Sequence, residues 1–180
     1  IGRGVAATVA GSLRHKAAAR HEYPAVGDWV ALRAHEAGRR AVVHAVLPRR
    51  SKFSRKVAGD ETDEQIVAAN IDTVFLMMGL DADYSLRRME RYLATAHEGG
   101  AAPVVVLNKA DLADDLQARV AEVQAAAAGA PVVAVSTKHD AQLATIEPYL
   151  APGRTIALLG SSGVGKSTLV NRLVGRDLQR

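Results

Sequence analysis

The stretch GSSGVGKSTL at residues 160–169 contains the pattern G-x-x-x-x-G-K-[ST], which is typical of a loop that binds phosphate groups. Its fixed positions are Gly160, Gly165, Lys166 and Ser167. The glycines let successive backbone N–H groups point at an anion, the lysine adds a positive charge, and the serine hydroxyl is a ligand for Mg²⁺. We therefore predict a site for a nucleotide phosphate chain, with Ser167 as a protein ligand to magnesium.

A second motif, Asn-Lys-Ala-Asp at residues 108–111, directly follows the apolar stretch PVVVL. At the carboxyl end of a strand, the Asp111 carboxylate can accept two hydrogen bonds from the N1–H and N2–H₂ edge of guanine, a donor pair that adenine lacks. The stem of Lys109 is expected to lie over the purine, and Asn108 is expected to connect this loop to the phosphate loop. The alternative is that Asp111 only caps the following helix.

A third segment, Ser-Thr-Lys at residues 136–138, ends the next apolar stretch. It resembles the loop whose backbone N–H meets the base oxygen in guanine-nucleotide-binding proteins. Within the predicted site, Lys166 and Ser167 are assigned to catalysis. The full set of predicted nucleotide-binding residues is Asn108, Lys109, Ala110, Asp111, Ser136, Thr137, Lys138, Gly160, Ser161, Ser162, Gly163, Val164, Gly165, Lys166, Ser167 and Thr168.

These motifs lie in a region where strands and helices are expected to alternate. Continuous apolar stretches predict strands, and apolar residues at helical spacing predict helices, with Ser85 placed to cap the first helix. The predicted strands cover residues 71–80, 102–108, 130–136 and 154–160, and the predicted helices cover 85–98, 112–129, 141–150 and 165–175. Such alternation implies right-handed crossovers and a parallel sheet with helices on both faces. The predicted fold class is α/β, of the P-loop NTPase type.

The first 60 residues differ in charge from the rest, because they contain 12 Lys and Arg against 4 Asp and Glu, whereas residues 61–180 contain 11 against 15. Three short Val- and Ala-rich stretches in this basic head predict a small β-barrel, with Trp29 in its core or half-buried. A basic surface favours a polyanion such as RNA, and the alternative is a solvated face without a partner. The candidate RNA contacts are Arg39, Arg40, Arg49, Arg50, Lys52, Arg55 and Lys56.

The composition excludes several kinds of protein. Because the sequence has no cysteine, it has neither a disulfide nor a thiolate metal site, and its six histidines show no paired spacing for a metal. No apolar stretch approaches the roughly 20 residues of a membrane-spanning helix. We therefore expect a cytoplasmic protein that acts as a monomer and without a membrane. The first residue, Ile1 in place of Met, predicts that the chain is a fragment.

The order of the two main motifs is informative, since residues 108–111 precede the phosphate loop by about fifty residues. In Ras-like GTPases the phosphate loop comes first. A circular permutation explains the reversed order, and domain termini often lie close enough to be rejoined. Together with the basic head and the stretches VGDWV, QIVAANIDTVFLMMGLD and SLRRMERYL, the permuted motifs resemble the RsgA/YjeQ family of ribosome small-subunit-dependent GTPases.

This resemblance implies an OB-fold-like RNA-binding domain at residues 1–52 that lacks its N-terminal part, a linker at 53–70, and a circularly permuted GTPase domain at 71–180. It also implies GTP or GDP and Mg²⁺ as ligands, hydrolysis of GTP, and the small ribosomal subunit with its rRNA as partner. The family's switch regions, its D-T-P-G motif and its Cys/His zinc domain have no counterpart here. The implied Zn²⁺ therefore has no ligands in this chain, and the chain alone is expected not to hydrolyse GTP.

Two other classes of protein stay open at this point. One is a P-loop ATPase or kinase in which the Asn-Lys-Ala-Asp motif only caps a helix. The other is an RNA-binding protein whose phosphate loop has no catalytic role.

If the basic head binds RNA through phosphate contacts, the affinity of the chain for single-stranded RNA should fall steeply with salt, because each contact releases counterions. Titration with RNA at several salt concentrations, followed by the fluorescence of the single tryptophan, Trp29, measures this dependence. An affinity that does not change with salt would contradict the electrostatic hypothesis.

Overall fold

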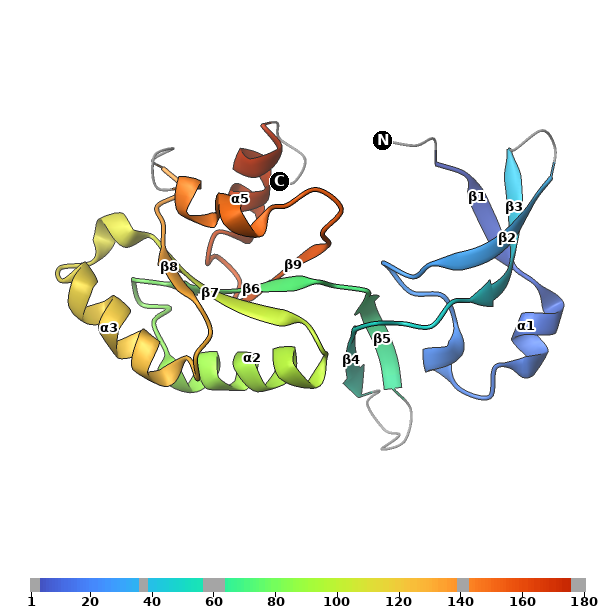
Figure 1. Cartoon of the computed structure of the whole chain (residues 1–180), viewed down its shortest axis with the longest axis horizontal. Helices are drawn as coiled ribbons and strands as arrows, with labels where there is room; N and C mark the ends of the chain where they lie inside the picture. The colour runs from blue at the N-terminus through green and yellow to red at the C-terminus, as the bar shows by residue number, and fades with distance from the viewer. Residues whose placement is uncertain (1–3, 36–38, 57–63, 139–142, 176–180) are drawn as a thin grey trace. The chain divides into compact units, whose positions relative to one another are not determined.

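The computed structural model describes residues 4–35, 39–56, 64–138 and 143–175. They fall into two compact units, Ile1–Asn70 (unit 1) and Ile71–Arg180 (unit 2), both drawn in Figure 1. Within the described ranges, none of the helices combines the length and the apolar character needed to cross a bilayer. The division into units does not itself assign a function to either part, so the RNA-binding and GTPase domains stay predictions.

Unit 2 is built on a four-stranded sheet with the order β8-β7-β6-β9, in which all neighbours are parallel. Its strands are β6 (Thr73–Gly79), β7 (Ala102–Asn108), β8 (Val132–Ala134) and β9 (Ile156–Gly160). These lie at the four predicted positions. Because parallel strands end at the same edge of a sheet, the loops that follow β6, β7, β8 and β9 meet there.

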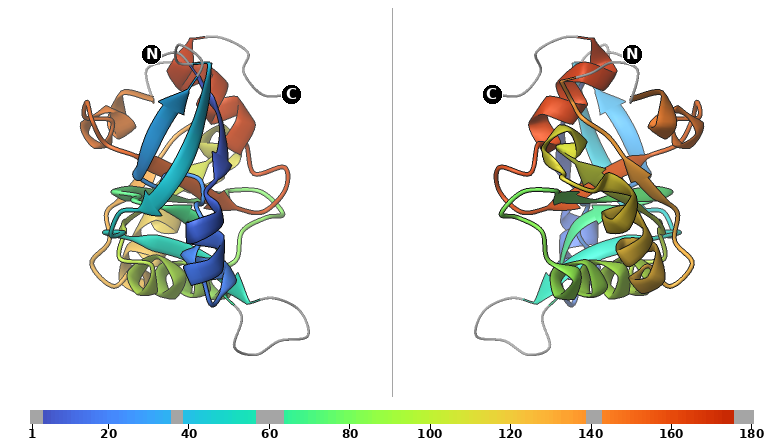
Figure 2. Two further views of the ribbon diagram at one scale, coloured as in Figure 1. Left: turned by 90° about the vertical axis from the view of Figure 1, so that its right-hand side faces the viewer. Right: turned by 90° about the vertical axis from the view of Figure 1, so that its left-hand side faces the viewer.

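Helices cover both faces of this sheet, as predicted (Figures 1 and 2). On one face lie α2 (Leu86–Glu98) and α3 (Leu116–Ala126). On the opposite face lie α5 (Lys166–Val174) and the 3₁₀ segment η4 (Ala144–Tyr149). The fold is the α/β arrangement expected of a P-loop protein.

Two helix starts follow from capping side chains. The Ser85 hydroxyl accepts a hydrogen bond from the Arg88 N–H at 3.4 Å, which confirms the predicted cap of α2. The helix predicted from residue 112 begins later, at Leu116, because the Asp115 carboxylate accepts from the Ala118 N–H at 2.9 Å and caps α3 there. The segment before it forms only a short 3₁₀ turn, Ala110–Leu112.

The core of unit 2 is organised around β6, whose residues from Val74 to Gly79 are all buried. Phe75 and Met77 pack with Ile146 of η4 and Leu169 of α5 in one cluster. The side chains between them alternate to the other face of the sheet, where α2 and α3 lie. A strand covered on both faces explains why the sequence here is continuously apolar.

Unit 1 contains an open three-stranded sheet in its described part, with the order β1-β3-β2. β1 runs parallel to β3, and β2 runs antiparallel to it. The bounds of its elements are β1 Ala6–Val9, α1 Gly11–Lys16, the 3₁₀ turn η1 Arg20–Glu22, β2 Val30–His35 and β3 Arg40–Val46. The expectation for Trp29 is wrong, since 67% of this residue is exposed. It directly precedes β2, an edge strand with a largely exposed surface.

The segment expected to be a linker, residues 53–70, differs from that prediction because much of it pairs as strands. β4 (Lys52–Lys56) and β5 (Glu64–Ala69) form an antiparallel two-stranded sheet. The end of β5 is fixed to the rest of unit 1, because the Asn70 amide donates to the Gly27 carbonyl oxygen at 3.0 Å. The charged residues of this segment do not distinguish a strand from a solvated loop, and the pairing of β4 with β5 depends on contacts between residues distant in the sequence.

Replacing the fully buried ring of Phe75 by alanine (F75A) should lower the free energy of unfolding of unit 2 by about 3–5 kcal/mol. The ring also makes an edge-to-face contact with Tyr149, with centroids 6.3 Å apart. Urea unfolding followed by circular dichroism measures the loss. In the control L112A, whose side chain is largely exposed, the change should stay within about 0.5 kcal/mol. Equal losses in the two variants would contradict the assignment of the core.

Candidate nucleotide-binding site

The phosphate loop connects the end of β9 at Gly160 to the start of α5 at Lys166. Gly163 and Gly165 take left-handed backbone conformations, with φ of 77° and 104°. The Lys166 ammonium donates to the carbonyl oxygens of Gly160 and Ser161 at 2.9 and 2.6 Å. Both of these acceptors are neutral oxygens, so the positive charge of Lys166 remains available to an anion.

Asn108 joins the base motif to the phosphate loop. Its amide nitrogen donates to the Val164 carbonyl oxygen at 2.8 Å, and its amide oxygen accepts from the Thr137 N–H at 3.3 Å. The residue is only 1% exposed. A Cβ at Gly165 would lie 2.3 Å from the Asn108 amide nitrogen, so the approach requires glycine at this position. The predicted connection between the two loops is confirmed.

The Asp111 carboxylate is held by the third predicted segment. It accepts from the Ser136 hydroxyl at 2.7 Å and from the Lys138 ammonium at 2.8 Å. These bonds, first that of Lys138 and then that of Ser136, lower the pKa of Asp111 to about 2. The carboxylate is therefore charged at neutral pH, and each of its oxygens keeps a further lone pair for a ligand N–H.

The sign of this pKa shift fixes its effect on stability. Since the pKa of Asp111 in the fold lies below its ordinary value of 3.8, the stabilising contribution is present above pH 3.8 and is lost as the pH falls toward 2. The alternative, that Asp111 only caps the following helix, does not match these contacts. Asp115 caps α3, and the bonds of Asp111 go to the 136–138 segment.

Two carboxylates of the site were not predicted from the sequence. Both lie in the loop between β6 and α2, where Asp81 accepts from the Lys109 ammonium at 2.6 Å and Asp83 accepts from the Ser161 hydroxyl at 2.6 Å. Arg88 forms an ion pair with Asp83 at 2.7 Å. The available signal was the Asp-Ala-Asp sequence just after a strand end, because polar residues at that edge of a parallel sheet often face a ligand.

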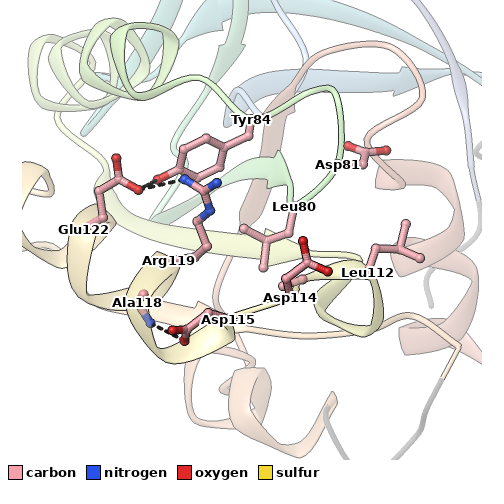
Figure 3. Close-up of a pocket in the computed structure, with 10 residues that line it drawn as sticks. Leu80, Asp81, Tyr84, Leu112, Asp114, Asp115, Ala118, Arg119 and Glu122 are labelled. Carbon is pink, nitrogen blue, oxygen red and sulfur yellow. Dashed lines mark hydrogen bonds and ion pairs between the residues drawn. The ribbon is translucent and has the colours of Figure 1, made fainter.

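A pocket of about 310 Å³ lies beside the base motif, between the β6–α2 loop and α3 (Figure 3). Within it the Arg119 guanidinium stacks on the Tyr84 ring at 4.7 Å, and the Tyr84 hydroxyl donates to the Glu122 carboxylate at 2.7 Å. Figure 3 shows Asp81 apart from this group. No residue of the phosphate loop lines this pocket.

The candidate RNA contacts of unit 1 fall into three groups. The Arg49 guanidinium donates to the Asp28 carboxylate at 2.7 and 2.8 Å and also to two backbone carbonyl oxygens, so it serves the fold of unit 1. Arg55 and Lys56 lie in β4, with side chains outside the described part. The candidates with exposed side chains are Arg39, Arg40, Arg50 and Lys52. These four stay predictions as phosphate contacts.

The described residues contain no group of three or more His, Asp or Glu side chains that could hold a metal ion. Ser167, the predicted magnesium ligand, lies at the second position of α5.

The phosphate loop is a glycine-rich turn between β9 and α5. The base motif follows β7, which is earlier in the chain than β9 and lies two places from it in the sheet. This arrangement defines the class as P-loop GTPases with a circularly permuted fold. The chain belongs to the RsgA GTPase family, whose family model matches residues 46–180. The predicted family and fold class are confirmed.

Curated relatives include the small ribosomal subunit biogenesis GTPase RsgA of Opitutus terrae, 52% identical over 97% of this chain and 50% of its own length. A protein of the same name from Methanosarcina acetivorans is 48% identical over 87% of this chain and 42% of its own length. The chain spans about half the length of these curated relatives.

Two solved structures have the same fold. The crystal structure of YjeQ from Thermotoga maritima matches 96% of this chain and 58% of that chain, with a TM-score of 0.75 and 28% identity. The structure of YloQ, described as a circularly permuted GTPase, matches 93% of this chain and 54% of its own, with a TM-score of 0.66 and 25% identity.

Replacing Asn108 by alanine should lower the free energy of unfolding by about 1–3 kcal/mol, because the Val164 carbonyl and the Thr137 N–H would lose a buried partner. Chemical denaturation of the ligand-free chain measures this loss. The control D114N changes an exposed side chain in the same region and should leave stability within about 0.5 kcal/mol. If N108A were as stable as the wild type, Asn108 would not hold the two loops together.

Proposed function

We propose that unit 2 binds GTP and GDP together with Mg²⁺. The observation that supports this most directly is the bonding of Asn108 to both Val164 and Thr137, because it joins the predicted phosphate, base and base-oxygen loops at one edge of the sheet. A ligand that spans these loops has a phosphate chain at one end and a guanine at the other.

In this proposal each residue has a definite role. Backbone N–H groups from Ser161 to Thr168 surround the phosphates at the start of α5, where the helix dipole favours negative charge. Lys166 moves from its carbonyl oxygens to the β and γ phosphates, and Ser167 binds Mg²⁺. Asp111 accepts the two guanine donors, and the N–H groups of the 136–138 segment face the base oxygen.

We further propose that the protein to which this chain belongs hydrolyses GTP during biogenesis of the small ribosomal subunit. The names of the relatives, which are small ribosomal subunit biogenesis GTPases, support this reaction and this partner. The same names favour a cytoplasmic location. A monomeric state, rRNA contact through the exposed basic residues of unit 1 and the family's Zn²⁺ stay hypotheses, and this chain contributes no cysteine ligand to such a metal.

A purine-competition experiment tests the nucleotide assignment. We expect the wild-type chain to bind GDP with Mg²⁺ at least a hundredfold more tightly than ADP, because adenine leaves the charged Asp111 without its donors. In D111N, an amide nitrogen faces the guanine N–H groups, so GDP affinity should fall and xanthosine diphosphate should become the preferred ligand. Calorimetry with the three nucleotides measures both effects.

The other classes of protein make different predictions in the same experiment. A P-loop ATPase or kinase would bind ADP as well as GDP and would be indifferent to D111N. An RNA-binding protein whose phosphate loop has no role would bind no nucleotide, and K166A would leave the calorimetric signal unchanged. Either result would contradict the proposed function.

A further inference from the structure

The two lysines of the site lie in opposite electrostatic surroundings. The Lys166 ammonium donates to two neutral carbonyl oxygens, whereas the Lys109 ammonium forms an ion pair with the Asp81 carboxylate at 2.6 Å. Both members of that pair are partly shielded, with side chains 29% and 28% exposed. The charge of Lys109 is therefore largely neutralised, while the charge of Lys166 is not.

The backbone fixes where the Lys109 side chain begins. Lys109 is one of the few non-glycine residues with a left-handed backbone, at φ of 61°. Its neighbours are tied on both sides, since the Leu80 N–H donates to the Asn108 carbonyl at 2.9 Å and the Ala110 N–H donates to the Val135 carbonyl at 3.0 Å. The backbone at the edge of the sheet thus fixes the Cα–Cβ direction of Lys109, and only the long side chain beyond Cβ remains flexible.

Asp81 is itself held in place before any ligand arrives. Its Oδ1 atom accepts from the Asp83 N–H at 3.1 Å, and Asp83 is anchored by Arg88 and by the Ser161 hydroxyl. Gly79 makes room for this turn, because a Cβ there would lie 2.4 Å from Oδ1 of Asp81. The carboxylate that receives Lys109 is therefore a fixed point at the end of β6.

From this geometry we propose that Asp81 is a positioning residue for nucleotide binding: it holds the Lys109 ammonium, so that the lysine stem forms one wall of the purine pocket and the charge is withheld from the phosphates. The inference rests on the proposed guanine-nucleotide site. It extends that site to Asp81, which lies outside the phosphate and base motifs. In this proposal the charge of Lys109 is neutralised by Asp81, and the charge of Lys166 binds the phosphates.

A double-mutant cycle on the whole chain tests the proposal, with D81N, K109M and the double variant compared for GDP affinity in the presence of Mg²⁺. Methionine keeps an unbranched apolar stem and removes the ammonium. Each single variant should bind GDP about three- to fivefold more weakly than the wild type, which is the scale of a partly exposed ion pair. The double variant should bind like the single ones, since all three lack the same interaction.

Further measurements separate positioning from other effects. The loss in D81N should be the same for GMP, GDP and GTP, because the wall contacts the base and not the phosphates. The preference for GDP over ADP should be unchanged, because Asp111 is intact. The control D114N removes a negative charge from a nearby residue and should leave GDP affinity within about 1.5-fold of the wild type.

The possible outcomes are distinct. A further loss when D81N is added to K109M would mean that Asp81 acts through the fold of the loop and would overturn the proposal. A gain of GTP affinity in D81N would mean that Lys109 is a phosphate ligand restrained by Asp81, which also overturns it. A wild-type chain that binds no guanine nucleotide would refute the proposed function itself, and the assignment of Asp81 with it.

Discussion

The whole site depends on one buried amide. Asn108 is the last residue of β7, and its two polar atoms bond to the loops that follow β8 and β9. Because an unpaired buried N–H or C=O costs about 1–3 kcal/mol, neither loop can move away alone without a penalty. Three segments that are separate in the chain are thus held as one surface, and the left-handed Gly165 gives the amide the space that it needs.

The sequence was sufficient for the parts of this surface that depend on local chemistry. The phosphate loop needs glycines and a lysine at fixed spacing, and a strand before it and a helix after it, all of which are visible in residues 154–175. The continuous apolar stretch of β6 indicated a strand covered on both faces, and Ser85 indicated the start of α2. The tie between Asn108 and the phosphate loop followed from placing both motifs at the same edge of a parallel sheet.

Pairings between distant residues that no motif fixes could not be predicted. Asp81 and Asp83 have no fixed spacing to the residues that they bind, Lys109 and Ser161, and only the crossing of the chain brings them together. The β4–β5 pair was hidden because its charged residues look the same in a solvated loop and in a sheet. Trp29 was expected in the core or half-buried because it lies in the middle strand-like stretch of a predicted barrel, but β2, which follows it, is an edge strand with a largely exposed surface.

The position of β6 in the sheet has a consequence for synthesis. This central strand pairs with β7 on one side and with β9 on the other, and β9 is made last of the four. Until β9 emerges from a translating ribosome, β6 can pair with β7, but its other edge has unpaired N–H and C=O groups, which are prone to bind other chains. The proposed nucleotide can therefore stabilise a nascent molecule only after β9 and α5, which hold the phosphate loop between them, have been released.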